Sequence, residues 1–276
     1  GLGVLRRSKR KSRESLSNMA SQKTASSILT RAEKCVHPVV HAISCRMSAP
    51  TVIFDDFESK SVSSQRIDEL LANGWRHAGE HFYRYNFAFH QGMLTEVIPL
   101  RIQLGQFQPS KSQRKIWRRN QNKDYHIEIR PTVVDDEKNA LFQQHKSKFV
   151  DNVPDQLHDF LAHEPHAVPC EGREVAVYHQ DQLIGTSFFD VGEQSISTIY
   201  GMYDLEYGKQ GLGIYTMMLE MEHAKALGKP YYYHGYCYRC PSFYDYKKRF
   251  TGLEAFDWEG NWRPWEENDS EPQITA

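Results

Sequence analysis

The stretch GLGIYTMMLEMEHAKALGKPYYYHGYCY, residues 211–238, carries the clearest local pattern in this chain of 276 residues. Residues 211–227 are typical of a helix, and Gly228 with Pro230 ends it, because glycine terminates helices and proline cannot continue them. The eight residues YYYHGYCY then predict a strand over 231–238. A helix that leads directly into a strand is the connection that parallel strands need.

The residues before this stretch predict three more strands. REVAVYHQ and QLIGTSFFDV flank a polar turn at Asp181 and predict a hairpin, and SISTIYGMYD, 195–204, follows as a third strand. The order over 173–250 is therefore an antiparallel meander, a crossover helix and a parallel strand. This is the arrangement of an acyl-CoA N-acyltransferase core. We expect the α+β class, with an N-acyltransferase (GNAT-like) mixed sheet and flanking helices, preceded by a smaller α/β N-terminal region.

In that architecture two neighbouring parallel strands, here 195–203 and 231–238, separate and open a cleft. The turn before the crossover helix, YGKQGLGIY, is rich in glycine, which permits close backbone approach. Its free N–H groups lie at a helix N-terminus, which favours a phosphate. Gly208 stands where acetyltransferases usually have Gln or Arg, so the turn departs from their pattern.

The tyrosine-rich strand 231–238 should present two faces, one packed against a helix and one lining the cleft. Alternation predicts that one face carries Tyr232, His234, Tyr236 and Tyr238, and the other Tyr231, Tyr233, Gly235 and Cys237. A glycine within a strand indicates a close approach by another group, and we interpret Gly235 as marking a ligand.

The remaining elements follow from shorter patterns. We expect strands at TVIFDDF, HFYRYNFAF, VIPLRIQLGQF and HIEIRP, and helices over 63–72, 133–150 and 241–250, the last with Pro241 in its first turn. Pro99 lacks an N–H group and moves its strand toward an edge or a bulge.

Charge and cysteine usage limit the function classes. The formal net charge is −1, which argues against a bulk electrostatic grip on nucleic acid. Basic residues gather at 109–123 around Trp117. This segment is either a solvated face or an RNA contact that binds phosphates and stacks on bases. The basic run 6–13 is interpreted as a solvated tail. Five scattered cysteines favour reduced thiols and a cytoplasmic protein, and no apolar run of about 18 residues predicts a membrane span.

A metal site is not expected. Cys237 and Cys240 supply two ligands where a tetrahedral zinc needs four, and only Cys170 and His234 could add to them within the organised region. Buried thiols near a strand end are the favoured interpretation. The histidines His37, His41, His77 and His81 have no metal-binding spacing and are interpreted as structural or exposed.

Several separated motifs resemble one family, the aminoacyl-tRNA–protein transferases, and more narrowly the arginyl- and leucyl-transferases of the bacterial N-degron pathway. The similar segments are NGWRHAGEHFYRY, VIPLRI, FQPSKSQRKIWRRN, IYGMYD, GLGIYTMMLEMEHAKALGKPYYYHGY and YDYKKRF, in the family's order between about residues 51 and 262. The family usually carries a cysteine cluster between the RYN-like and PLR-like segments. Here that region, NFAFHQGMLTEVIPLRI, has no cysteine, so the cluster's metal site and any cofactor are not expected.

The resemblance implies a division of the chain and a reaction. We expect a disordered leader or mis-assigned start over 1–46, an N-terminal transferase region over 47–130, a GNAT-like acyltransferase domain over 131–265 and a disordered tail over 266–276. The implied reaction moves an arginyl or leucyl group from charged tRNA to the N-terminal α-amino group of acceptor proteins and marks them for degradation. The implied partners are aminoacyl-tRNA and those acceptors, with no membrane and no DNA.

Candidate site residues follow from this reaction, which requires positioning, oxyanion stabilisation and one proton transfer. Asp204 is predicted to bind the acceptor's ammonium group or remove its proton, Tyr236 and Tyr246 to donate to the ester carbonyl or the ribose oxygen, and Lys247 to offset negative charge. The residues predicted to hold tRNA are Arg114, Arg118, Arg119, Lys209, Gly211 and Gly213.

Two other functions remain open from the sequence. An acetyl-CoA-dependent N-acetyltransferase would use the same fold, although the weak glycine motif and the basic segment 109–123 argue against it. A non-catalytic module that binds protein N-termini is favoured by the missing cysteines. The donor amino acid, the acceptor residue and the oligomeric state are not determined by the sequence.

Overall fold

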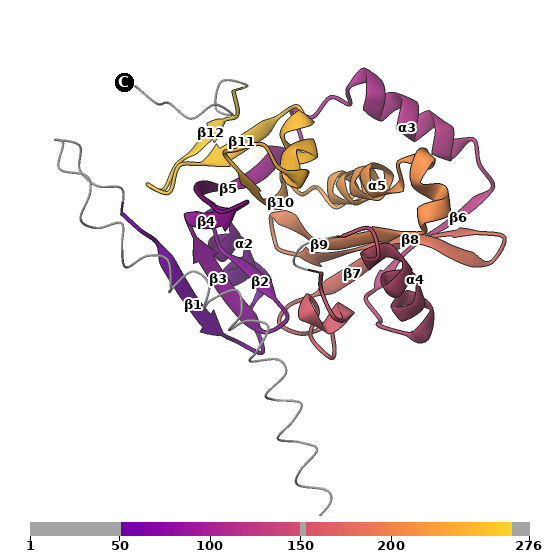
Figure 1. Ribbon diagram of the computed structural model, residues 1–276, viewed down its shortest axis with the longest axis horizontal. Helices are drawn as coiled ribbons and strands as arrows, with labels where there is room; N and C mark the ends of the chain where they lie inside the picture. The colour runs from indigo at the N-terminus through magenta and orange to yellow at the C-terminus, as the bar shows by residue number, and fades with distance from the viewer. Residues whose placement is uncertain (1–50, 150–152, 267–276) are drawn as a thin grey trace, which may run out of the picture. The chain divides into compact units, whose positions relative to one another are not determined.

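The computed structural model describes residues 51–149 and 153–266. The expectations for 1–46 and for nearly all of the tail 266–276 therefore lie outside the described residues. Figure 1 shows the order of the elements along the chain. The strands are β1 (Phe54–Glu58), β2 (Arg76–Ala78), β3 (His81–Tyr85), β4 (Phe87–His90), β5 (Met93–Gln103), β6 (Tyr125–Pro131), β7 (Gly172–His179), β8 (Gln182–Val191), β9 (Ser195–Tyr203), β10 (Tyr231–Tyr238), β11 (Leu253–Phe256) and β12 (Trp262–Pro264).

The helices separate these strands at the positions where capping residues occur. Ser63, Ser110 and Asp135 each accept a hydrogen bond from a backbone N–H of the first turn, as N-cap side chains do. The α-helices are α2 (Ser64–Ala72), α3 (Lys111–Gln121), α4 (Asp136–Lys146) and α5 (Leu212–Ala226), and the 3₁₀ helices are η2 (Leu157–Asp159), η3 (Leu205–Gln210) and η4 (Phe243–Arg249).

The large sheet is mixed and has nine strands, in the order β12-β11-β5-β10-β9-β8-β7-β6 with β4 paired to β5. The predicted hairpin β7–β8, the antiparallel β9 and the parallel β10 after the crossover helix α5 are confirmed. Figure 1 shows α5 and α4 on opposite sides of β7–β9. Leu212 and Met221 on α5 belong to one apolar core, and Leu141 and Phe142 on α4 belong to a second.

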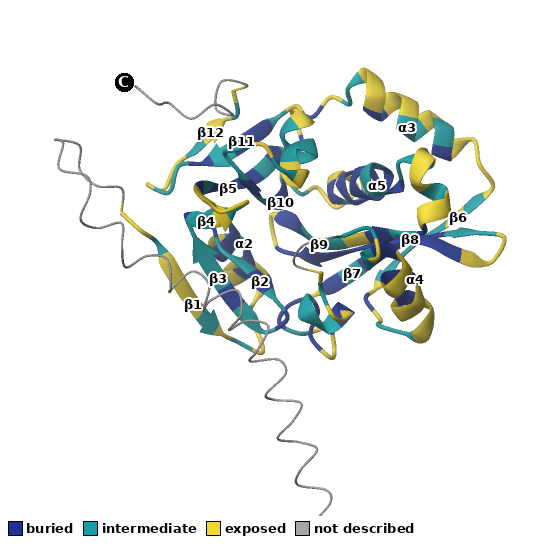
Figure 2. Ribbon diagram, in the orientation of Figure 1, coloured by how far each residue is buried: buried dark blue, intermediate teal, exposed yellow. Residues whose placement is uncertain are grey.

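Burial follows this layering. Figure 2 shows α5 and β8 buried along most of their length, whereas α3 is largely exposed on its outer side. A helix that is apolar nearly all round, as α5 is, needs cover on every side, and the sheet together with α3 supplies it. No helix in the described part of the chain is long and apolar enough to cross a membrane.

Strands form in each of the N-terminal segments that the sequence suggested, with two differences. HFYRYNFAF is divided at Asn86 into β3, in the three-stranded sheet β1-β3-β2, and β4, on the large sheet. Pro99 lies in β5, and β5 lies between β10 and β11 in the sheet. The predicted edge position of this strand is therefore wrong. The alternative prediction, a bulge, has a counterpart in the register shift of the partner strand β10. β5 and β7–β10 share one sheet, so backbone hydrogen bonds join the two predicted regions 47–130 and 131–265. The boundary between these regions at residue 130 stays a prediction.

The 3₁₀ helix η4 replaces the helix expected over 241–250. Ser242 caps it by accepting from the N–H of Tyr244, and Asp245 accepts from the N–H of Ser242 at 3.0 Å. Pro241 thus precedes the cap and does not lie in the first turn. The short helix places Tyr246 and Lys247 beside the end of β10.

A bulge in β10 changes which side chains face the core. The register against β5 shifts between Tyr233 and Gly235, and Gly235 has φ +86°, a value that favours glycine. Tyr232 and Cys237 therefore share the main core, although strict alternation placed them on opposite faces. The predicted set Tyr232, His234, Tyr236 and Tyr238 is for this reason not a single face.

Replacing Gly235 by alanine tests the bulge. An alanine there would adopt a left-handed backbone conformation, which costs about 1–2 kcal/mol. We expect G235A to lower the free energy of unfolding by about that amount in urea denaturation. Gly201 on β9 has no positive φ and an added Cβ would meet Ser187 at 3.6 Å, so G201A is the matched control with a smaller effect. Equal losses in the two variants would contradict the strained bulge.

Candidate active site

The parallel strands β9 and β10 separate after three residue pairs, as the sequence predicted. Pairing runs from Tyr231 opposite Ser195 to Tyr233 opposite Ser197 and then stops, although both strands continue. Past this point β9 stays on β8, and β10 stays on β5. We call this place the strand fork, defined by Ser197 and Thr198 on β9 and His234 and Gly235 on β10.

Arg76 from β2 enters the strand fork. Its Nη1 donates to Ser197 Oγ at 2.6 Å and its Nη2 donates to the carbonyl of Thr198. A Cβ atom on Gly235 would lie 3.4 Å from the Arg76 guanidinium. The group that approaches Gly235 is thus the chain's own arginine, and the interpretation of Gly235 as a ligand marker is wrong. Sequence reasoning missed Arg76 because its partner Ser197 is 121 residues away and no local pattern joins the two.

Two further nitrogen-bearing side chains lie at the strand fork. Lys247 Nζ donates to the carbonyl of Tyr236 at 2.9 Å, and burial, followed by the charge of Arg76, lowers the pKa of Lys247 to about 7. His234 is 1% exposed, and neither ring nitrogen has a hydrogen-bond partner among the described residues. Burial and then the charges of Lys247 and Arg76 hold the pKa of His234 well below its usual value, so its ring is neutral at pH 7.

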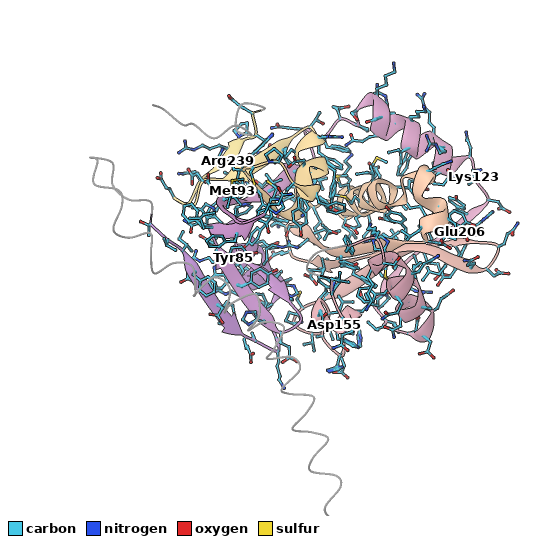
Figure 3. All side chains as sticks on the ribbon, viewed as in Figure 1. Tyr85, Met93, Lys123, Asp155, Glu206 and Arg239 are labelled. Atoms are coloured by element: carbon cyan, nitrogen blue, oxygen red, sulfur yellow. The ribbon has the colours of Figure 1, made fainter. Side chains whose placement is uncertain are left out.

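Tyrosines line the β3 side of the strand fork. Tyr236 donates its hydroxyl to the carbonyl of Gly74 at 2.6 Å, and its ring packs edge to face on Tyr83 and on Tyr85, which Figure 3 labels. Burial raises the pKa of Tyr236 and that of Tyr246. Both phenols are therefore protonated donors at neutral pH. The predicted residues Tyr236, Tyr246 and Lys247 are brought together, since Lys247 holds the Tyr236 backbone and follows Tyr246 in η4.

The β9 side carries residues that the sequence analysis did not single out. The Tyr200 hydroxyl is buried and has no partner among the described residues. Phe149, just after α4, packs edge to face on Phe243 of η4 at 5.9 Å. Lys148 lies 4.6 Å from the centre of the Tyr203 ring, and burial lowers the pKa of Lys148 to about 8. The contact of Phe149 with Phe243 connects η4 to the segment that follows α4.

A buried carboxyl lies under the strand fork, on α5. Glu220 is fully buried, and its Oε2 accepts from the Tyr232 hydroxyl at 2.6 Å. Thr198 Oγ1, at 3.5 Å, is its second partner. Burial raises the pKa of Glu220 to about 7, because desolvation disfavours the carboxylate. No pattern in the sequence indicated this residue beyond its place inside an apolar helix.

Asp204 lies apart from the groups at the strand fork, at the start of η3. Its Oδ1 accepts from the N–H of Glu206 and from Gln144 Nε2, both at 2.9 Å, and its Oδ2 accepts from Gln182 Nε2 at 3.2 Å. Both carboxylate oxygens are therefore engaged in capping η3 and joining it to α4 and β8. Its catalytic role stays a prediction.

The glycine turn before α5 packs against α3. Gly211 has φ +74°, and an added Cβ would lie 3.1 Å from Ile116 of α3. Arg119 donates to the carbonyl of Lys209, and Asn120 Nδ2 donates to that of Gln210 at 3.0 Å. A Cβ added at Gly213 would lie 3.6 Å from the Tyr203 ring. The predicted tRNA-binding residues Arg119, Lys209, Gly211 and Gly213 thus gather at this contact between α3 and α5.

A hollow of about 310 Å³ lies beside α3 and α5 and includes two more of those predicted residues. Arg114 and Arg118 are exposed on α3, one turn apart, with the Trp117 ring beside them. The hollow is lined by Phe107, Pro109, Arg114, Trp117, Arg118, Met218 and Glu222. An aromatic ring between arginines suits a nucleobase and its phosphate.

The cysteines do not form a four-ligand metal site in the described part of the chain. Cys237 is buried in the main core, and Cys240 lies beyond the end of β10. The ligand atoms of Cys170, His77 and Asp190 lie within 4.8 Å of one another. These groups satisfy each other, since His77 Nε2 lies 2.6 Å from Asp190 Oδ2 and Asp190 also bonds the Cys170 thiol. The expectation of no metal stays a prediction.

Comparison with known proteins places the chain. Residues 136–257 match the family described as arginine-tRNA-protein transferase, C terminus, and residues 11–115 match its N-terminus. An aspartate/glutamate leucyltransferase of Stenotrophomonas maltophilia is 30% identical over 73% of this chain and 79% of its own length. An aspartate/glutamate leucyltransferase of Marinobacter nauticus is 25% identical over 73% of this chain and 83% of its own length. The crystal structure of FemX aligns over 70% of this chain and 65% of its own, with a TM-score of 0.41 and 11% identity, which is a weak likeness.

A mixed sheet whose parallel strands separate beside phenols and nitrogen-bearing side chains, together with these relatives, indicates an aminoacyltransferase. The chain belongs to the aminoacyl-tRNA–protein transferase family. The resemblance found in the sequence is thereby confirmed, and membership implies aminoacyl-tRNA and a protein as substrates.

Substituting Glu220 tests the buried carboxyl. Its pKa in the folded chain, about 7, exceeds the ordinary 4.5, so the folded state binds more protons between these values and its stability falls as pH rises through that range. The shift corresponds to at most on the order of 3 kcal/mol. We expect E220Q to remove this pH-dependent loss, measured by urea denaturation at pH 5 and pH 8.

The exposed Glu222 on the same helix is the matched control for E220Q. E222Q should keep the pH dependence of the unmodified chain. The raised pKa of buried Glu220 would be contradicted if the unfolding free energy of E220Q changed with pH as much as that of the unmodified chain.

Proposed function

We propose that this protein transfers a leucyl group from charged tRNA to the N-terminal α-amino group of proteins that begin with Asp or Glu. The relatives at 25–30% identity are named aspartate/glutamate leucyltransferases, which supports this donor and these acceptors. Arginine is the second candidate donor, because the matching family description refers to arginine-tRNA. The reaction takes place in the cytoplasm, and its product is marked for degradation by its new N-terminal residue.

The fold that carries this reaction is proposed to be an N-acyltransferase (GNAT-like) core formed by β7–β10 and α5. Three observations support it: the antiparallel order β7-β8-β9, the crossover through α5, and the pairing of β9 with β10 over only three residues. In such a core the acyl donor and the amine meet where the parallel strands separate. The strand fork is that place here.

The chemistry needs no covalent enzyme intermediate. The neutral α-amine attacks the ester carbonyl, the tetrahedral intermediate carries an oxyanion, and the ribose oxygen leaves with a proton. Tyr246, whose hydroxyl bonds no other described residue, is the better placed phenol for the leaving oxygen. Tyr236 donates to Gly74, so it serves the ester carbonyl only after releasing that bond. Lys247 offsets negative charge in the site, and Asp204 holds the edge of the site through η3.

The tRNA is proposed to lie along α3. Arg114 and Arg118 contact its phosphates, the hollow beside Trp117 takes a base, and Arg119, Lys209, Gly211 and Gly213 bring the acceptor end toward the strand fork. The contact of α3 with the glycine turn supports this path, because it joins the basic helix to the start of α5.

A transfer assay tests the proposed function. Purified protein is mixed with tRNA charged with labelled leucine or arginine, and with peptides that begin with Asp, Glu or Lys. We expect label from leucyl-tRNA in the Asp and Glu peptides. Label from arginyl-tRNA alone would change the donor. No label from either donor, with the protein folded, would overturn the proposal, and thermal stabilisation by acetyl-CoA would then favour an N-acetyltransferase over a binding module.

The tRNA path on α3 is tested by salt dependence. Each phosphate contact that is lost should reduce the slope of log affinity against log salt by about 1. We expect the double variant R114A/R118A to bind tRNA more weakly with a slope smaller by about 2, measured by filter binding. K60A is the control, since Lys60 is an exposed lysine before α2. An unchanged slope in R114A/R118A would remove α3 from the RNA path.

A further inference from the structure

Three nitrogen-bearing groups meet at the strand fork, and the carboxyl below it, Glu220, bonds Tyr232 and Thr198 instead of any of the three. Arg76 and Lys247 each act on the charge of His234, and Arg76 acts on that of Lys247. In the described residues no Asp or Glu forms an ion pair with Arg76 or Lys247. Elsewhere such groups are paired: Arg101 with Glu254 at 2.6 Å and Lys138 with Glu174 at 3.0 Å. Arg76 and Lys247 are half-buried, and charges withdrawn from water are normally paired, so the strand fork is suited to one negative group.

The protein partners of these groups leave donors free. Arg76 has five N–H groups and uses two, on Ser197 and on the Thr198 carbonyl. Lys247, when protonated, has three and uses one, on the Tyr236 carbonyl. The buried ring of His234 uses neither nitrogen. Arginine offers its remaining donors as a planar fork, a geometry that matches the two oxygens of a carboxylate.

We propose that Arg76 and Lys247 bind the side-chain carboxylate of the acceptor's first residue, with the His234 ring as a neutral neighbour. This inference rests on the proposed function, in which the acceptor begins with Asp or Glu. The aromatic wall of Tyr83, Tyr85 and Tyr236 excludes water beside the ion pair, which strengthens it. The first residue's α-amine then lies near Tyr246, which directly precedes Lys247 in η4.

The same geometry accounts for the rejection of other acceptors. An amide side chain, as in Gln, is nearly the same shape as Glu but leaves both cations of the strand fork without a negative partner. A site built to bond one group discriminates strongly against an analogue that lacks it, because its own polar groups are left unpaired. A Lys at the first position is repelled by Arg76 and Lys247. The selection therefore depends on charge more than on size.

Peptide binding without tRNA tests this site separately from transfer. The full chain is titrated into fluorescent peptides that begin with Glu or Gln and are otherwise identical, and affinity is measured by anisotropy. We expect the unmodified protein to prefer Glu by about 10-fold or more, since a charged hydrogen bond is lost with Gln. K247Q and R76Q should both reduce this preference to about 2-fold or less. R249Q, the same charge change at an exposed position of η4, should keep it.

The outcomes distinguish a carboxylate site from a phosphate site. The inference is overturned if folded K247Q keeps the preference for Glu, or if the unmodified protein binds both peptides alike. It is also overturned if the preference survives in both variants while affinity for uncharged tRNA falls, since the cations then bind phosphate. Loss of the preference in both variants, with label transfer absent from every donor, supports the site and rejects the proposed reaction instead. Thermal unfolding of each variant confirms that the chain is folded.

Discussion

The Arg76 guanidinium at the strand fork is the contact on which the geometry of the candidate site depends. It bonds two residues of β9, Ser197 and Thr198, and lies beside Gly235 of β10. Parallel strands would otherwise continue their ladder, since both β9 and β10 extend beyond their last pair. A charged side chain from a different sheet thus bonds β9 at the point where the pairing of β9 with β10 stops.

This arrangement shows why the C-terminal core needs the N-terminal segments. The small sheet β1-β3-β2 supplies Arg76, Tyr83 and Tyr85 to the strand fork. The helix α2 packs on Tyr233 of β10 through an apolar cluster with Ile67, which fixes β2 near β10. The site is therefore assembled from two sheets, and the sheet that holds β9 and β10 does not contain all of its functional side chains.

The sequence predicted what depends on local pattern and missed what depends on long-range contact. The meander, α5 and β10 were found because alternation, glycine stops and helix length are local properties. The faces of β10 were wrong, because a bulge at one glycine reverses alternation and leaves no separate signal. Tyr236, Tyr246 and Lys247 were placed together through the family resemblance. Arg76 and Glu220 were missed because only the folded chain brings them to the strand fork.

The position of β5 has a consequence for how the chain is made. β5 is formed by residues 93–103, but its neighbours β10 and β11 come from 231–238 and 253–256. During synthesis, the apolar residues Leu100 and Ile102 leave the ribosome about 150 residues before their register partners on β11, Ala255 and Leu253. Contacts this distant in sequence form slowly, and the incomplete sheet exposes strand edges. The nascent chain therefore has to keep residues 97–103 of β5, which β4 does not pair, from associating with other chains until its last strands have been translated.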